Sequence, residues 1–203
     1  MENLVIENHK KYCDRISLFQ QLGYDIPKER NFIIENVQPI EGKILEIGTG
    51  NGYFSVALVE KGYSFTTLDM VEEDQNIAKM NIQYLGLQDQ VDFVVADAQQ
   101  LPFSDNSYDI SFAINLIHHL ANPLKVIDEI LRVTSSKGKV ILSDFSKEGF
   151  AVMEEMHLSE GRNHDSGYCT LNEIAEYAEG KGMNIDRVDS KFQKMLIVYK
   201  RSN

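Results

Sequence analysis

The sequence has no apolar run long enough to cross a bilayer. Its apolar stretches are short, such as Lys139-Val140-Ile141-Leu142, whereas a membrane-spanning helix needs about 20 apolar residues. The first residues, 1–8, show no basic region followed by an apolar stretch, which a secretory signal would have. We therefore expect a cytoplasmic protein with no membrane partner.

Basic residues and cysteines are also scarce. Lys and Arg number 20 against 31 Asp and Glu, so the formal net charge is −11, and no cluster of basic residues stands out. A surface this acidic repels phosphate backbones, which argues against a nucleic acid partner. The two cysteines, Cys13 and Cys169, are far apart in the chain and are expected to be reduced thiols.

The 203 residues suit one domain with a full core. We expect a helical N-terminal cap over residues 1–40 and a cofactor-binding core over 41–145. Residues 146–203 are expected to supply a lid segment, a helix and a closing hairpin. The sequence leaves open whether the protein is a monomer or a homodimer.

Strands and helices alternate along the core. Helical spacing covers residues 7–22 and 27–35, and strand-like runs follow at 43–47, 65–68, 91–95, 108–114 and 140–143. Helices are expected between them at 53–60, 72–85 and 123–133. Such alternation indicates βαβ units, and the nearly all-apolar strands indicate a parallel sheet that is buried on both faces.

The tail has a different pattern. Thr170 and Glu173 form a capping-box pattern that opens a helix ending at Gly180. Two strand-like runs, 183–188 and 192–199, follow with a short link, so they must be antiparallel. The expected fold is an α/β, mostly parallel seven-stranded sheet with a C-terminal antiparallel hairpin.

A glycine-rich turn, Glu46-Ile47-Gly48-Thr49-Gly50-Asn51-Gly52, joins the first core strand to the next helix. Glycines allow a sharp turn and a close approach of a ligand to the backbone. The dinucleotide fingerprint G-x-G-x-x-G is incomplete, because its third glycine is replaced by Tyr53 or, one register later, by Ser55. A carboxylate at Glu46 would repel a pyrophosphate, but it suits a ligand that carries an ammonium and a sulfonium.

Further polar residues stand at the ends of the next strands. Asp69, followed by Met70, ends the second strand 21 residues after Gly48, close to the roughly 20-residue spacing of an acid that binds ribose hydroxyls. Asp97 and Ala98 follow the third strand, where an acid can accept from an adenine amino group. Asn115 ends the fourth strand, and its backbone can face a sulfonium.

Together these residues resemble the class I S-adenosylmethionine-dependent methyltransferases. Residues 46–52 look like the family's first motif, and Asp69 matches its ribose-binding acid. Asp97-Ala98, with Leu101-Pro102-Phe103 and Ser107-Tyr108-Asp109, resembles the small-molecule branch that includes quinone and sterol methyltransferases. Residues 115–120 and 131–138 fit the later motifs. One departure is Ser135-Ser136, where the family usually has a proline, and we expect it to alter only a loop.

The resemblance implies a Rossmann-like doubly wound fold, S-adenosylmethionine as methyl donor and S-adenosylhomocysteine as product. The acceptor would be a small molecule, methylated by in-line displacement. The cofactor contacts that it implies are Glu46, Gly48, Thr49, Gly50, Gly52, Asp69, Met70, Asp97, Ala98 and Asn115.

The catalytic residues stay unknown at this stage. His118 and His119 follow the fourth strand, where the acceptor should lie, and an imidazole can act as a general base; adjacent histidines can equally have no part in proton transfer. The segment 156–169 carries His157, Glu160, His164 and Cys169, which are zinc-ligand types. Their spacing matches no standard finger, so substrate contact or plain surface is the preferred interpretation, with no metal expected.

Three rival functions remain open. An aminopropyl transferase would use a decarboxylated donor, but the extra acids that such enzymes carry for a polyamine cannot be identified in this sequence. A dinucleotide-dependent reductase could share the fold, but it should have the third glycine and lack the closing hairpin. A non-catalytic regulator that binds S-adenosylmethionine would carry the same motifs. For an enzyme, the sulfonium methyl is already activated, so the protein's main task is to align donor and acceptor and exclude water. A base is needed only if the acceptor must lose a proton.

Overall fold

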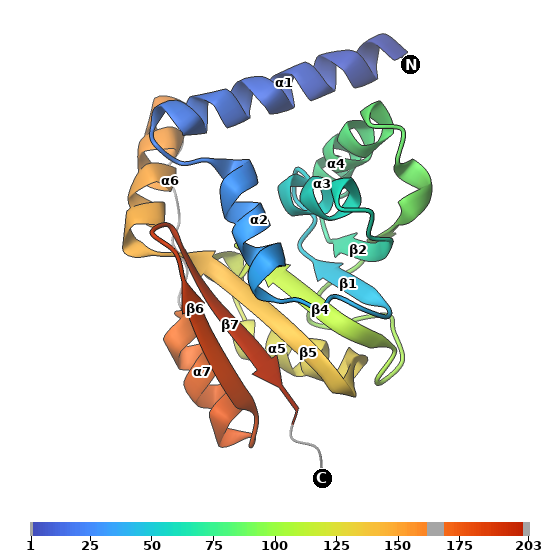
Figure 1. The fold of residues 1–203 in the computed structure, drawn as a ribbon, viewed down its shortest axis with the longest axis vertical. Coiled ribbons are helices and arrows are strands. Elements are labelled where there is room, and N and C mark those ends of the chain that lie inside the picture. Colours follow the sequence, from blue (N-terminus) through green and yellow to red (C-terminus); the bar gives the residue numbers. More distant parts are fainter. Residues whose placement is uncertain (1, 162–168, 201–203) are drawn as a thin grey trace.

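A computed structural model describes residues 2–161 and 169–200. Its strands form one seven-stranded sheet in the order β3-β2-β1-β4-β5-β7-β6 (Figure 1). Strands β1 to β5 are parallel, and β7 runs antiparallel to both β5 and β6. The predicted, mostly parallel sheet with an antiparallel hairpin is confirmed. The strands are β1 Ile44–Ile47, β2 Phe65–Asp69, β3 Val91–Val95, β4 Tyr108–Ile114, β5 Thr134–Phe145, β6 Asn184–Asp189 and β7 Gln193–Tyr199.

Helices occur where the periodicity predicts them, with one addition. The addition is α6, which follows β5 directly, where the sequence analysis placed only a lid segment. The helices are α1 Glu2–Gln21, α2 Ile26–Asn36, α3 Tyr53–Glu60, α4 Glu72–Tyr84, α5 Pro123–Val133, α6 Lys147–Ser159 and α7 Leu171–Gly180, with short 3-10 turns η1 Gln88–Gln90 and η2 Ile117–His119.

Local signals explain several helix starts. The Asp25 side chain accepts a hydrogen bond from Lys28 N at 2.9 Å and caps α2. At α7, Thr170 accepts from Glu173 N while Glu173 accepts from Thr170 N, which is the predicted capping box. The start of α6 is capped by the Ser146 hydroxyl, which accepts from Gly149 N at 3.1 Å.

Strand β5 begins earlier than predicted. It starts at Thr134, so Ser135 and Ser136 lie in the strand, and the expectation that they alter only a loop was wrong. Thr134 pairs with Tyr108, and a register shift between Tyr108 and Ile110 accommodates the extra length. The buried Thr134 hydroxyl contacts the Ser111 hydroxyl at 2.7 Å, which satisfies its polar atom inside the sheet.

The two faces of the sheet carry different helices. Leu45 and Ile47 of β1 join the core cluster under α5 and α7. Ile44, one position earlier, joins the cluster formed with α2, α3 and α4, as the alternation of side chains along a strand requires. Glu46 therefore also points to the α3 face.

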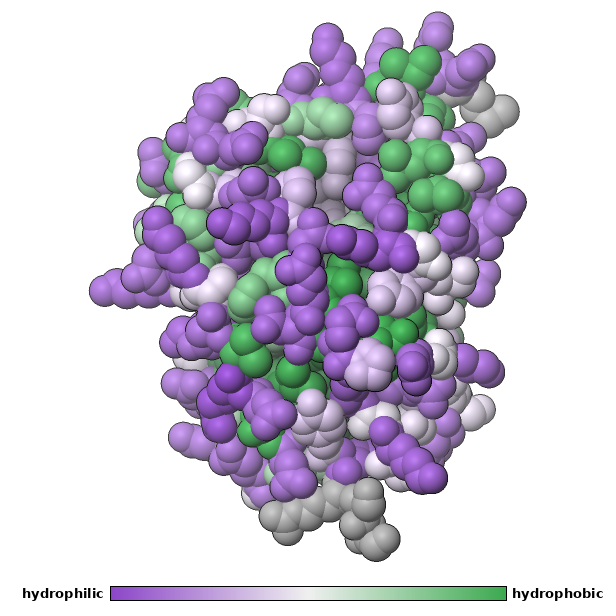
Figure 2. All heavy atoms as spheres, viewed as in Figure 1, coloured by the Kyte–Doolittle hydropathy of each residue, from purple (hydrophilic) through white to green (hydrophobic). Residues whose placement is uncertain are grey.

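Helix α1 crosses the molecule above the carboxyl ends of the parallel strands (Figure 1). One end is held on α4, where Asn8 donates to Ile77 O at 3.1 Å. The other end is held at the C-terminal end of α6 by an ion pair between Arg15 and Glu160, the residue that follows α6. Polar side chains cover most of the face shown in Figure 2. Within residues 2–161 and 169–200, no helix combines the length and apolar content of a membrane span.

Candidate active site

The glycine-rich turn lies at the carboxyl end of β1 and depends on backbone angles that favour glycine. Gly48, Gly50 and Gly52 have φ values of +83°, +47° and +84°. Gly48 N donates to Leu68 O at 2.8 Å, which binds the turn to β2. A Cβ added to Gly52 would lie 2.6 Å from the Cβ of Ala78, so glycine there is needed for the packing of α3 on α4.

Gly50 differs because its side of the turn is open. A Cβ added there would meet no atom within 4 Å. The Gly50 N–H donates to Asp69 Oδ2 at 2.8 Å, and Asp69 Oδ1 accepts from Val71 N at 3.0 Å. Asp69 thus joins the turn to the end of β2. The open side of Gly50 gives a ligand room to lie against the backbone beside this carboxylate.

The Glu46 and Thr49 side chains support the turn from within the protein. Glu46 is buried and accepts from Ser55 Oγ at 2.5 Å and Thr67 Oγ1 at 2.7 Å. Burial raises the pKa of the Glu46 carboxyl to about 7. The Thr49 hydroxyl lies 2.7 Å from the Thr67 hydroxyl and is also buried. The Glu46 and Thr49 side chains therefore form hydrogen bonds within the protein, on the side of the turn away from the open space at Gly50.

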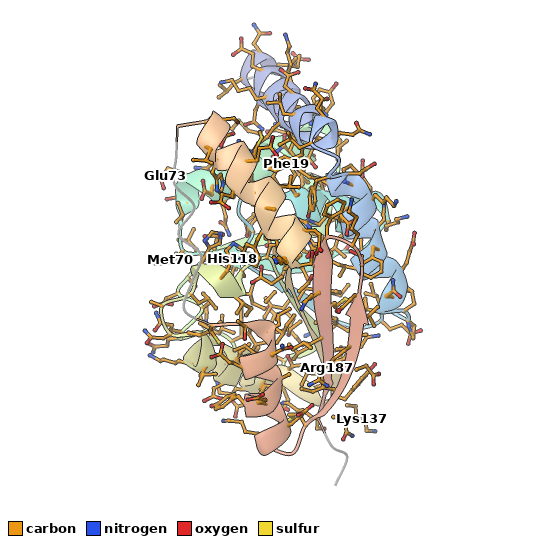
Figure 3. The ribbon with its side chains drawn as sticks, turned by 90° about the vertical axis from the view of Figure 1, so that its left-hand side faces the viewer. Phe19, Met70, Glu73, His118, Lys137 and Arg187 are labelled. Carbon is orange, nitrogen blue, oxygen red and sulfur yellow. The ribbon has the colours of Figure 1, made fainter. Side chains whose placement is uncertain are left out.

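The ends of β2 and β3 present exposed apolar side chains. Met70 is 69% exposed, and Val95 nearby in the sheet is 51% exposed. Asp97 accepts from Gln99 N at 2.8 Å, and Ala98 packs against the core below. Met70 and His118 lie along the same side of the molecule in Figure 3.

Arg30 is a site residue that the sequence analysis missed. It lies on α2 and is only 7% exposed. With the Asn115 amide oriented to suit its neighbours, Asn115 Oδ1 accepts from Arg30 Nη2 at 2.7 Å and Asn115 Nδ2 donates to Gln193 Oε1 at 2.9 Å. In the described part of the chain, no carboxylate lies within 4 Å of the guanidinium, and Arg30 Nε lacks a hydrogen-bond partner. A buried cation in this setting favours binding of an anion.

His118 and Asp144 form a buried pair at the ends of β4 and β5. Nδ1 of His118 lies 2.6 Å from Asp144 Oδ1, and Asp144 Oδ2 accepts from His118 N at 3.0 Å. The Phe145 N–H also donates to Asp144 Oδ1, at 2.9 Å. His119 is exposed, and its ring packs on that of His118. Asp144 was missed, although it stands near a strand end like Asp69 and Asp97.

A cavity of about 530 Å³ opens beside this pair. It lies where α6 and the start of α7 meet the ends of β4 and β5. Leu116 packs on the glycine-rich turn, since a Cβ added to Gly48 would lie 3.0 Å from it, and His118, two residues later, lines the cavity. Its walls include His118, Asp144, Lys147, Phe150, Cys169 and Lys194.

The four residues of zinc-ligand types in the segment 156–169 are not brought together among the residues that the structure describes. His157 lies in the last turn of α6, and Glu160 pairs with Arg15. Cys169 lines the cavity, while His164 lies outside the described residues. Within the described ranges, no three His, Cys, Asp or Glu residues form a group that could hold a metal ion.

Comparisons with known proteins agree with this geometry. Residues 45–142 match the family model described as a methyltransferase domain. A demethylmenaquinone methyltransferase of Clavibacter sepedonicus is 35% identical over 114 residues, which cover 54% of this chain and 44% of that protein. A sterol 4-C-methyltransferase of Caenorhabditis elegans is 31% identical over 136 residues, which cover 67% of this chain and 38% of that protein. The chain thus spans less than half the length of these relatives.

The fold is also similar to that of solved methyltransferase structures. The solved structure of an S-adenosylmethionine-dependent methyltransferase from Aquifex aeolicus superimposes with a TM-score of 0.67 at 20% identity, covering 92% of this chain and 98% of that one. The likeness at this identity concerns the fold. Taken with the matched domain and the curated relatives, it shows that the chain belongs to the class I S-adenosylmethionine-dependent methyltransferases.

Proposed function

We propose that this chain transfers a methyl group from S-adenosylmethionine to a small-molecule acceptor. The observation that carries the proposal is the open side of Gly50, where an added Cβ meets no atom and the Asp69 carboxylate stands within hydrogen-bond reach of the backbone. Ligands of such sheets bind beyond the carboxyl ends of the strands, which is where this turn lies.

The surrounding residues suit each part of the cofactor. Asp69 would accept from the ribose hydroxyls, and Asp97, with Met70 and Ala98, would hold the adenine. The Arg30 guanidinium offers a partner for the methionine carboxylate, because the described residues give it no carboxylate of their own. Gly48, Gly52, Thr49 and Glu46 would act by shaping the turn, and Asn115 by its place at the end of β4.

We also propose an acceptor other than nucleic acid and a cytoplasmic location. The net charge of −11 disfavours phosphate backbones, and the thiols of Cys13 and Cys169 are free, which suits a reducing compartment. The quinone and sterol relatives support a small molecule as acceptor. Light scattering after size-exclusion chromatography would separate a monomer from a homodimer.

Calorimetry tests the cofactor half of the proposal. S-adenosylhomocysteine should bind more tightly than NAD, and Asp69→Ala should weaken that binding by roughly 10-fold or more, since hydrogen bonds to a charged group contribute about 1.5–3 kcal/mol. Asp92→Ala is the matched control, because it removes an exposed acid near the amino end of β3, away from the carboxyl ends of the strands. Tighter binding of NAD would favour a reductase and overturn the proposal.

Transfer itself is tested with isotopically labelled methyl donor and fractionated small metabolites. Labelled product detected by mass spectrometry supports an enzyme. Tight cofactor binding without a labelled product in any fraction would favour the non-catalytic regulator.

A further inference from the structure

Two lysines face the cavity that contains His118. Lys147 is the first residue of α6, and Lys194 lies on β7 opposite Asp144 in the strand register. Across the described chain, neither ammonium has a carboxylate within 4 Å. Two lysines at one cavity depart from the acidic character of the whole protein, whose net charge is −11.

The acids of the cavity wall form no ion pair with these lysines among the described residues. Both Asp144 oxygens are already engaged, by the His118 ring and by two backbone N–H groups. Glu154, on α6, is the other carboxylate among the described wall residues. The two carboxylates thus equal the two lysines in number, but Asp144 is bound by His118 and backbone N–H groups, so Lys147 and Lys194 remain available to an anionic ligand group.

The same cavity holds a group suited to accept a proton. Asp144 binds Nδ1 of His118 and so favours the tautomer in which Nδ1 carries the hydrogen. An acceptor in the cavity would then exchange its proton with Nε2. The ring of Phe150 lies 5.3 Å from that of His118 in an edge arrangement, and Phe145 and Leu171 add apolar wall. Such walls favour a flat, apolar body next to the ionisable group.

We propose that the methyl acceptor is a hydroxyaryl carboxylate, with its hydroxyl at His118, its ring against Phe150 and its carboxylate between Lys147 and Lys194. The proposal rests on the proposed methyl transfer and names the class of molecule that this site takes. Asp144 is a positioning residue, because it acts through His118.

The chemical step balances without a further reactant. The hydroxyl proton passes to His118 Nε2, and an oxygen electron pair forms the new bond to the methyl carbon. The sulfur–methyl bond breaks with its electron pair staying on sulfur, which becomes a neutral thioether. The positive charge of the sulfonium is thereby replaced by that of the His118 imidazolium, which Asp144 stabilises.

The substrate arm uses the intact protein, labelled S-adenosylmethionine and paired probes. These are hydroxybenzoates and hydroxycinnamates, each with its neutral primary amide. We expect methylation of at least one acid, with a KM roughly 10-fold or more below that of its amide, because the amide lacks the charge that the lysines recognise. Equal KM values for acid and amide would overturn the carboxylate assignment.

The protein arm uses variants around the cavity. Lys147→Gln with Lys194→Gln should raise KM for the acid roughly 10-fold and leave KM for the amide unchanged. Lys191→Gln is the matched control, since Lys191 packs over the Phe192 ring and does not line the cavity. His118→Asn should lower kcat about 100-fold or more, the usual loss of a general base. Asp144→Asn should move the acidic limb of the pH–rate profile, which a purely structural role would leave in place.

Calorimetry with S-adenosylhomocysteine accompanies every variant as a check of folding. If the wild type binds S-adenosylhomocysteine and methylates none of the acids, the acceptor class is wrong while the cofactor assignment stands. If the wild type does not bind S-adenosylhomocysteine, the proposed function itself fails. Unchanged KM for the acid in the double lysine variant would also overturn the proposal.

Discussion

The Asn8 amide on α1 donates to Asn81 Oδ1 on α4 at 3.0 Å. Asn81 is 0% exposed, and its own amide donates to the carbonyl of Asn51 in the glycine-rich turn at 3.4 Å. One buried amide thus connects α1 to the turn on which the cofactor is proposed to lie.

Asn8→Ala should loosen α1. The change leaves Asn81 Oδ1 without its Asn8 donor, which we expect to lower the free energy of unfolding by about 1–3 kcal/mol. Hydrogen exchange of the α1 amides should become faster than that of the strands. Asn3→Ala, at an exposed position of the same helix, is the control, and equal exchange in both variants would show that this bond does not hold α1.

Arg30→Met should weaken binding of S-adenosylhomocysteine roughly 10- to 100-fold, because it removes a charge-assisted partner of the carboxylate. Adenosine, which has no carboxylate, should bind the variant as well as it binds the wild type. Asp69→Ala should weaken both ligands, so calorimetry with the two ligands separates the two residues.

Arg30→Lys keeps the charge and should recover part of the affinity for S-adenosylhomocysteine. In the ligand-free Arg30→Met protein, removal of a buried cation that lacks a carboxylate partner should offset the loss of its hydrogen bonds to Asn115, so little change in stability is expected. Unchanged affinity together with lower stability would mean that Arg30 only supports Asn115.

Gly50→Val should remain folded but lose cofactor binding, because its side chain would occupy the open side of the turn. The backbone strain of a non-glycine residue at φ +47° lowers the free energy of unfolding by about 1–2 kcal/mol, whether or not a ligand lies against Gly50. Gly62→Val matches it, since Gly62 also has a positive φ of +84° and no atom within 4 Å of an added Cβ, yet lies at the end of α3, away from the turn. Equal affinity for S-adenosylhomocysteine in both variants would show that no ligand lies against Gly50.

Glu46 should make stability depend on pH. Its pKa is about 7 in the folded protein against 4.5 normally, so the folded state holds a proton that the unfolded chain has released. Its contribution to stability is complete below pH 4.5 and is lost as the pH rises through 7. Urea unfolding of Glu46→Gln between pH 5 and 8 should show a shallower loss, by up to about 3 kcal/mol. Glu35→Gln, an exposed control, should follow the wild-type slope, and an identical slope in Glu46→Gln would contradict the assignment.

The sheet could be predicted because its signals are local. A compact apolar run bounded by Gly42 and Gly48 marks β1, and the Thr170–Glu173 pair marks α7. The position of Asp69 follows from its distance to Gly48 along the chain. Helix α6 is harder to predict, because Gly149 in its first turn weakens the helical pattern.

The charged groups of the site could not be predicted in the same way. Arg30 lies 85 positions before Asn115 in the chain, and only the packing of α2 beside β4 and β7 brings them together. The pairing of His118 with Asp144 likewise depends on β4 and β5 being neighbours. Asp144 itself could have been found by applying to the fifth strand the rule used for Asp69.

The insertion of β7 between β5 and β6 has a consequence for how the chain assembles as it is synthesised. Strand β6 leaves the ribosome first, but it is hydrogen-bonded only to β7. Until β7 follows, the edge of β5 stays open beside Val140, Ile141 and Leu142, which are buried in the finished sheet, and an open apolar edge invites pairing with other chains. Nascent chains in which β7 has not yet paired therefore expose this apolar edge to other chains.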